Sequence, residues 1–271
     1  MMNKVNYQID KDKQRHWFPY SYSEHSEDFV IPNGVHGRCP NIKCSDDCKS
    51  DNPDYWKNFS ITDTVSTSID IGCFGCSFTY GSFLEHSDSW PDVLEKQTGV
   101  STGNFGIPGG GIDSCFINLK NAYHKFGIKR AVVLVPYLDR RLCSFKINNL
   151  YFQYPIGPHS LWPFDDVVSS AFFDKDFIET KIEETKKDIV LDVDNKYSWQ
   201  KLDQIIEFCK NKIDLYVSSY DRNVYKKLVN TDANILPFYD LNAVDDRAVD
   251  KQHPCGLHNK IWVDSIKTDI C

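Results

Sequence analysis

The segment from Gly75 to Gly81 carries the residues best suited to chemistry. It reads Gly-Cys-Ser-Phe-Thr-Tyr-Gly and follows a short apolar run that predicts a buried strand. A serine there is exposed at the carboxyl edge of the strand, where backbone N–H groups of the turn can point at a developing oxyanion. Ser77 is therefore a candidate nucleophile. The spacing differs from the Gly-x-Ser-x-Gly elbow of α/β-hydrolases, and a phosphate-binding loop or a plain tight turn is the alternative interpretation.

A carboxylate and an imidazole lie near the other end of the chain. Asp250 and His253 are three residues apart, in a predicted loop immediately before the last helix. From that loop both side chains can project over the same strand edge as Ser77. A serine nucleophile needs a base within reach and a carboxylate that fixes the tautomer of the base. The pair can supply both groups, and an ordinary loop histidine beside a helix cap is the alternative.

Strands and helices are expected to alternate between these two segments. Apolar runs predict strands at 69–74, 131–135, 215–217 and 235–239, and helical patterns occur at 90–97, 112–126, 198–210, 221–229 and 257–270. Gly99 and Gly127 are the expected ends of two of these helices. The alternation predicts a three-layer α/β/α sandwich with right-handed crossovers around a five-stranded, mainly parallel, flavodoxin-like sheet.

Two stretches lie outside this alternation. Residues 1–66 are polar and interrupted by prolines, which predicts an irregular N-terminal arm ahead of a body at 67–271. Residues 142–195 predict an insertion over the carboxyl ends of the strands, where open α/β sheets bind ligands. The insertion is rich in aromatic residues that either pack it onto the sheet or stack on a sugar, for which Tyr151, Tyr154 and Trp162 are the candidates.

Three segments, in this order, resemble the conserved blocks of the SGNH (GDSL) hydrolase family. Gly75 to Gly81 is similar to the first block, and a Trp-Pro pair follows it at 90–91 as in the family. Asn104 to Gly109 is similar to the second block, and Asp250 to Pro254 matches the last block, Asp-x-x-His-Pro. The resemblance covers about residues 68 to 270. It implies an ester hydrolase in which Ser77 attacks the substrate.

The resemblance also assigns roles to other residues. It implies that Asp250 orients His253 as the base, and that the Gly109 amide joins that of Ser77 in the oxyanion hole. The usual third block, Gly-x-Asn-Asp, is absent, because the chain reads Pro-Tyr-Leu-Asp-Arg-Arg at 136–141. Arg140, in preference to Arg141, is the candidate oxyanion donor in place of the missing asparagine.

The first block also departs from the family. Cys76 stands at the usual aspartate position and cannot provide the same charge, so the support of the active-site loops must differ. A Gly-Cys-Ser-Phe-Thr block with a nearby arginine also resembles phage-encoded members. Cys76 is itself an alternative nucleophile.

Three functions are compatible with these motifs. The first is removal of an acyl group, such as acetyl, from a carbohydrate. This substrate class is inferred from the usual substrates of the family that the chain resembles and from the aromatic insertion. The second is acyl transfer by the same serine. The third is a catalytically weak binding or structural module, such as a part of a virus particle, which the missing asparagine favours and the intact Ser77, Asp250 and His253 oppose.

Ten cysteines are many for 271 residues. Four potential metal ligands lie close together in the arm, namely His36, Cys39, Cys44 and Cys48. They could hold a structural zinc ion, but the spacing lacks a Cys-x2-Cys knuckle, so free thiols or a local disulfide are the alternative. Catalysis by serine, histidine and aspartate needs no cofactor.

The charge balance limits the classes of partner that this chain is expected to bind. The chain has 31 basic and 38 acidic side chains, a formal net charge of −7, which disfavours binding to nucleic acid or an anionic membrane. A small-molecule or glycan ester fits better. No stretch approaches a membrane span, and residues 1–10 lack the apolar core of a secretory signal. We therefore expect a soluble protein, cytoplasmic or associated with a virus particle.

Overall fold

The computed structural model describes most of the predicted body. The described residues are 22–23, 69–82, 84, 86–107, 109–147, 150–158, 175–248 and 251–271. Most of the arm, including His36, Cys39, Cys44 and Cys48, lies outside them, as do Trp162 and Asp250. The zinc prediction therefore stays untested, and no group of metal-ligating side chains occurs among the described residues.

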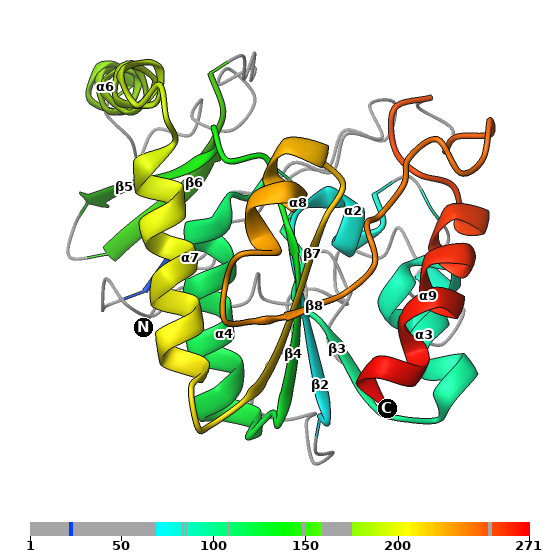
Figure 1. Ribbon diagram of the computed structural model, residues 1–271. Helices are drawn as coiled ribbons and strands as arrows, with labels where there is room; N and C mark the ends of the chain where they lie inside the picture. Colours follow the sequence, from blue (N-terminus) through cyan, green and yellow to red (C-terminus); the bar gives the residue numbers. More distant parts are fainter. Residues whose placement is uncertain are drawn as a thin grey trace, which may run out of the picture.

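A five-stranded sheet forms the centre of the molecule (Figure 1). Its order is β3 (Thr102–Asn104), β2 (Ile71–Phe74), β4 (Arg130–Val135), β7 (Asp214–Ser219) and β8 (Asn234–Ile235). All four neighbouring pairs are parallel. Numbered along the chain, the strand order is 2-1-3-4-5, which is the flavodoxin-like order. The prediction of this sheet is confirmed, and the five strands are entirely parallel.

Helices cover both faces of the sheet and make three layers (Figure 1). One face packs against α4 (Ile112–Phe126), α7 (Lys196–Cys209) and α8 (Arg222–Leu228). The other face packs against α3 (Trp90–Thr98) and α9 (Gly256–Ile270). As predicted, α3 and α4 end at Gly99 and Gly127.

Strand β4 shows how the sequence builds both halves of the core. Successive side chains of a strand point to opposite faces of a sheet. Val133 and Val135 accordingly join the cluster that contains α4 and α7, whereas Val132 and Leu134 join the cluster that contains α3 and α9. Because β4 is apolar at every one of these positions, it is buried on both faces, as expected of a central parallel strand.

The sequence predicted the edge strands less well. Strand β3 was missed, because Thr-Gly-Asn contains no apolar run. Strand β8 stops at Ile235 rather than extending to Tyr239, since Pro237 has no N–H to give to a ladder. Beyond β8 the chain still follows β7, with Leu236 N donating to the Val217 carbonyl at 2.9 Å. Two short helices were also missed, α2 (Ser77–Tyr80) and η3 (His86–Asp88).

The predicted insertion contains regular elements. Strands β5 (Arg141–Ile147) and β6 (Leu150–Ile156) form an antiparallel hairpin, and α6 (Lys175–Leu191) follows it. Strand β1 (Tyr22–Ser23) of the arm pairs antiparallel with β6, so this second sheet has the order β1-β6-β5. Tyr151 and Tyr154 belong to β6, but their side chains lie outside the described part, so their role in substrate binding stays a prediction.

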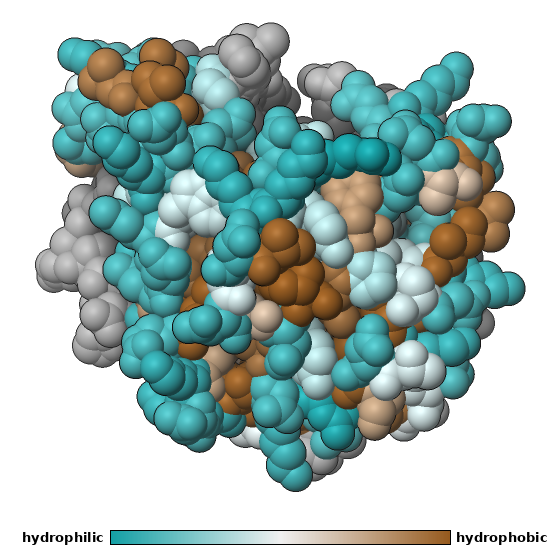
Figure 2. Space-filling model, viewed as in Figure 1, coloured by the Kyte–Doolittle hydropathy of each residue, from teal (hydrophilic) through white to brown (hydrophobic). Residues whose placement is uncertain are grey.

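Most of the visible surface is polar. Figure 2 shows hydrophilic side chains over most of one face, with apolar groups in separate patches, one of them over α6 at the upper left. Within the described residues, no helix combines the length and apolar character needed to cross a membrane.

Candidate functional site

Ser77 begins a one-turn helix directly after strand β2. Cys76 is the N-cap of α2, and the turn closes through Tyr80 N to the Cys76 carbonyl at 3.0 Å and Gly81 N to the Ser77 carbonyl at 2.9 Å. The N–H of the first residue of a helix has no partner within that helix. Ser77 thus combines a hydroxyl and an N–H in the turn at the carboxyl end of a strand, although the residue is only 8% exposed.

Hydrogen bonds fix this turn against its neighbours. The Thr79 hydroxyl donates to the Phe74 carbonyl at 3.4 Å and accepts from the Trp90 indole N–H at 3.2 Å. Asn104, which begins the second motif, donates from its amide to the Thr79 carbonyl at 3.0 Å. Trp90 and Asn104 were singled out by the family resemblance, and their contacts with α2 give both a positional role.

The loop from Phe105 to Gly111 runs beside the turn. Ile107 N donates to the Gly75 carbonyl at 2.9 Å, which continues the pairing of β3 and β2 beyond the sheet. A Cβ at Gly106 would overlap the backbone of Tyr80, so only glycine allows this close approach. Gly109 has a φ of 76°, a left-handed conformation that favours glycine. The structure therefore places Gly109 in a loop held against α2.

Cys76 lies in a buried cluster with a tyrosine from another strand. The Cys76 Sγ lies 3.4 Å from the hydroxyl of Tyr220, which directly follows β7. The same hydroxyl accepts from Tyr137 N at 3.1 Å. The Ser77 Oγ donates to Cys76 Sγ at 3.9 Å. The cysteine is 1% exposed, so its position favours support of the turn over nucleophilic attack.

The two arginines that follow β4 have different environments. Arg141 forms a salt bridge with Asp192 at 2.6 Å and stacks on the Tyr197 ring. The Arg140 guanidinium lies over the Tyr137 ring, 4.9 Å from its centroid. Its Nη1 is buried and has no hydrogen-bond partner among the described residues. Arg140 therefore has a buried N–H donor with no partner in the described part of the chain, whereas Arg141 is held by Asp192, and the choice of Arg140 as oxyanion donor stays a prediction.

His253 reaches the same edge from the loop before α9. Its ring lies edge-on to Phe78, the residue after Ser77, with 5.4 Å between ring centroids. Contacts join the described residues on either side of this loop: Ala248 N donates to the His253 carbonyl at 3.0 Å, and Arg247 pairs with Pro254 in an isolated bridge. The structure thus brings His253 to the turn that carries Ser77. Asp250 lies outside the described residues, and its role stays a prediction.

The arrangement has the parts for nucleophilic attack on a carbonyl group. Three groups lie around the carboxyl ends of β2 and β4. They are the Ser77 hydroxyl, the His253 imidazole beside Phe78, and the Arg140 guanidinium with its buried Nη1. Burial raises the pKa of Tyr220 well above its usual value, and it also raises that of Tyr137. Both phenols therefore stay neutral at physiological pH and can act only through hydrogen bonds and ring contacts.

Phe78, Tyr137 and Tyr220 were not found by the sequence reasoning. Phe78 and Tyr137 lie inside segments that were quoted as motifs, but only as spacers between other residues. Tyr220 lies three residues after the predicted strand at 215–217, which is the one sequence signal that could have marked it, because carboxyl ends of parallel strands share an edge.

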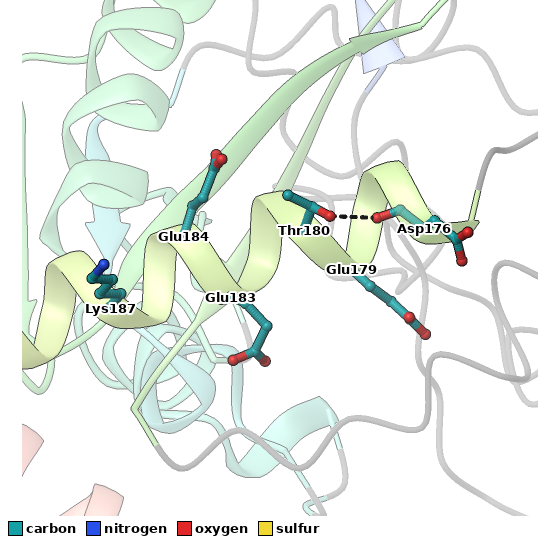
Figure 3. A pocket seen from close by; sticks show the side chains of 6 residues that line it. All are labelled: Asp176, Glu179, Thr180, Glu183, Glu184 and Lys187. Carbon is teal, nitrogen blue, oxygen red and sulfur yellow. Dashed lines mark hydrogen bonds between the residues drawn. The ribbon is translucent and has the colours of Figure 1, made fainter.

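Two surface hollows occur among the described residues. One, of about 670 Å³, follows α6 and is lined by Thr180, Lys187 and four acidic residues, Asp176, Glu179, Glu183 and Glu184 (Figure 3). The other, of about 560 Å³, lies by η3, α3 and the start of α9. Neither is lined by Ser77 or His253, so neither is taken as the substrate site.

The similarity of this chain to known proteins is one of fold, found among solved structures. No protein-family model and no curated protein matches the chain. Three matching solved structures are a member of the lipolytic protein G-D-S-L family from Veillonella parvula, the psychrotrophic esterase EstA from Pseudoalteromonas sp., and AlinE4, an SGNH-hydrolase family esterase. Their identities to this chain are 13%, 11% and 18%, and their TM-scores are 0.45, 0.44 and 0.38. The matches cover 73%, 75% and 76% of this chain and 96%, 96% and 97% of theirs.

Proposed function

We propose that this chain is an SGNH-type serine ester hydrolase. One observation carries the proposal: Ser77, in the turn at the carboxyl end of β2, is followed by a ring that contacts His253. These are the two residues that the first and last motifs designate as nucleophile and base. They are far apart in the sequence, yet they lie at the same edge of the sheet. The proposed chemistry requires this placement, and a fold unrelated to it does not.

The reaction starts with a rotation of the Ser77 hydroxyl. In the resting arrangement the hydroxyl donates to Cys76 Sγ over a long 3.9 Å contact, which is easily broken. Turned toward His253, the hydroxyl gives its proton to the imidazole while its oxygen attacks the ester carbonyl. Asp250 would orient the imidazole and stabilise its charged form, as the Asp-x-x-His-Pro motif implies.

The negative oxygen of the tetrahedral intermediate needs donors. The N–H groups of Ser77 and Gly109 and the Arg140 guanidinium are proposed to supply them. His253 then returns the proton to the departing alcohol, which leaves an acyl group on Ser77. A water molecule, deprotonated by His253, attacks this acyl-enzyme and releases the carboxylic acid and the free serine.

The substrate is proposed to be an acylated carbohydrate, with acetyl as the acyl group. This finer assignment rests on the family resemblance and on the aromatic insertion with Tyr151, Tyr154 and Trp162. A screen of acetylated glycans for release of acetate tests it separately from the esterase assignment.

Labelling with a fluorophosphonate and turnover of short p-nitrophenyl esters test the esterase assignment. We expect the wild type to be labelled on Ser77 and to hydrolyse the esters, and Ser77→Ala to lose both properties. Ser265→Ala is the matched control, because its hydroxyl donates to the Trp262 carbonyl within α9 and the substitution should change neither. Unchanged turnover in Ser77→Ala would overturn the assignment, and labelling of Cys76 would make the thiol the nucleophile.

A further inference from the structure

The Tyr220 hydroxyl joins two loops that the sheet topology brings together. Tyr220 follows β7, and the residue is 6% exposed. The hydroxyl oxygen accepts from Tyr137 N at 3.1 Å in the loop after β4, and it lies 3.4 Å from Cys76 Sγ in the loop after β2. One atom therefore ties the turn that carries Ser77 to the loop that carries Arg140.

The Tyr220 ring extends the same link. It packs against Phe78 with 4.4 Å between centroids and meets Tyr137 edge-on at 5.0 Å. Phe78 in turn contacts His253, so Tyr220, Phe78 and His253 form a continuous row of rings. Arg140 stacks on the Tyr137 ring from the other loop. Tyr220 is thus in contact with immediate neighbours of Ser77, His253 and Arg140, three of the residues that take part in the proposed reaction.

We propose that Tyr220 is a positioning residue for this site, whose hydroxyl holds the Arg140 loop in register with the Ser77 turn. The inference rests on the proposed ester hydrolysis. The hydroxyl does not touch the reacting atoms, and it acts through Cys76 on one side and through Tyr137 on the other. Oxyanion stabilisation depends on the donor being fixed before the charge develops, so a loosened Arg140 loop loses transition-state stabilisation while substrate binding changes little.

Tyr220→Phe is the direct test, because it keeps the ring contacts and removes only the hydroxyl. For p-nitrophenyl acetate we expect kcat to fall about tenfold, with KM within about twofold of the wild type. Tyr225→Phe is the control: it also removes one tyrosine hydroxyl, bonded to the Leu236 carbonyl at 3.1 Å, but its ring packs on Phe238, outside the row formed by Tyr220, Phe78 and His253. Its kcat should equal that of the wild type.

If Tyr220→Phe acted only by destabilising the protein, its effect on kcat would not depend on whether Arg140 is present. We therefore repeat the substitution in an Arg140→Ala background. Because the hydroxyl is proposed to act through Arg140, Tyr220→Phe should lower the remaining kcat by less than about twofold there. Cys76→Ala removes the same link from its other end and serves as the second variant if Tyr220→Phe fails to fold. The factor by which Cys76→Ala lowers kcat should likewise be smaller in the Arg140→Ala background than in the wild type.

The outcomes separate this inference from the proposed function. Turnover that depends on Ser77, with kcat unchanged in Tyr220→Phe, would overturn the positioning role and leave the esterase intact. The positioning role would also be overturned if Tyr220→Phe lowered kcat by the same factor in the wild-type and Arg140→Ala backgrounds. No Ser77-dependent turnover or labelling in the wild type would overturn both.

Discussion

The Phe78 ring lies edge-on to the His253 imidazole, 5.4 Å between centroids, and its other neighbour is the Tyr220 ring at 4.4 Å. The residue that follows the proposed nucleophile therefore supports the proposed base. This contact makes the position of the imidazole depend on the turn that presents the serine, although the two segments come from opposite ends of the body.

Replacing Phe78 with leucine should lower kcat for a short ester by about threefold to tenfold, because aromatic pairs are worth about 0.5–1.5 kcal/mol beyond their burial and leucine cannot reproduce them. Steady-state kinetics measure the effect. Phe208→Leu on α7 is the control, since Phe208 also meets an aromatic ring edge-on, that of Tyr123, but far from the edge. Equal kcat values for the two variants would contradict the supporting role.

The two neighbouring arginines should behave differently when each is replaced with alanine. Arg140→Ala is expected to lower kcat by about 10²–10³, the typical cost of one lost oxyanion donor, with little change in stability. Arg141→Ala breaks a partly buried salt bridge with Asp192, so it should cost about 1–3 kcal/mol of unfolding free energy and leave kcat near the wild-type value. Urea unfolding and steady-state kinetics on both proteins check the pair, and an interchange of the two effects would contradict the assignment.

Asp113 gives a pH dependence with a definite sign. Its carboxylate is buried at the start of α4 and accepts from Leu142 N at 2.7 Å. Burial raises its pKa above the usual 3.8. Just above that pH the folded chain keeps a proton that the unfolded chain has lost, so the contribution of Asp113 to stability falls as pH rises through this window.

Asp113→Asn removes this titration. Measured by urea unfolding between pH 4 and 7, the stability of the wild type relative to the variant should decrease as the pH rises. A difference that is constant with pH, or that grows, would contradict the raised pKa.

Gly106→Ala should disturb the turn that carries Ser77. Because the new Cβ would overlap the Tyr80 backbone, we expect a loss of more than about 2 kcal/mol of unfolding free energy and slower fluorophosphonate labelling. Gly99→Asn is the control, at a left-handed position with open space around it, where asparagine is tolerated. Thermal unfolding and labelling rates compare the two, and a larger loss for Gly99→Asn would contradict the packing argument.

The body of the fold was predictable because its signals are local. The burial of β4 on both faces requires an unbroken apolar run, and the glycines after α3 and α4 mark their ends within a single turn. The edge strands carry weaker signals. Strand β3 is short, polar and paired on one side only, so nothing in its composition distinguishes it from a loop.

Motifs of the sequence named Ser77 and His253, and Arg140 was chosen from the segment that stands where the third motif is missing; the roles of all three stay predictions. Tyr220 could not be chosen in the same way, since its contact with Cys76 spans 144 positions and depends on β2, β4 and β7 lying in consecutive order. Such a contact follows from topology, and no spacing along the chain encodes it.

The pairing of β1 with β6 has a consequence for the order of folding. Tyr22 faces Phe152, so this contact closes a loop of more than one hundred residues, which costs more chain entropy than the adjacent β5–β6 hairpin. The hairpin can therefore form first and offer a template, and β1 adds to it afterwards. During synthesis on the ribosome, the segment around Tyr22 leaves the exit tunnel long before its partner strand exists. Until β1 arrives, β6 has an open edge, which is the kind of surface that recruits strands from other chains.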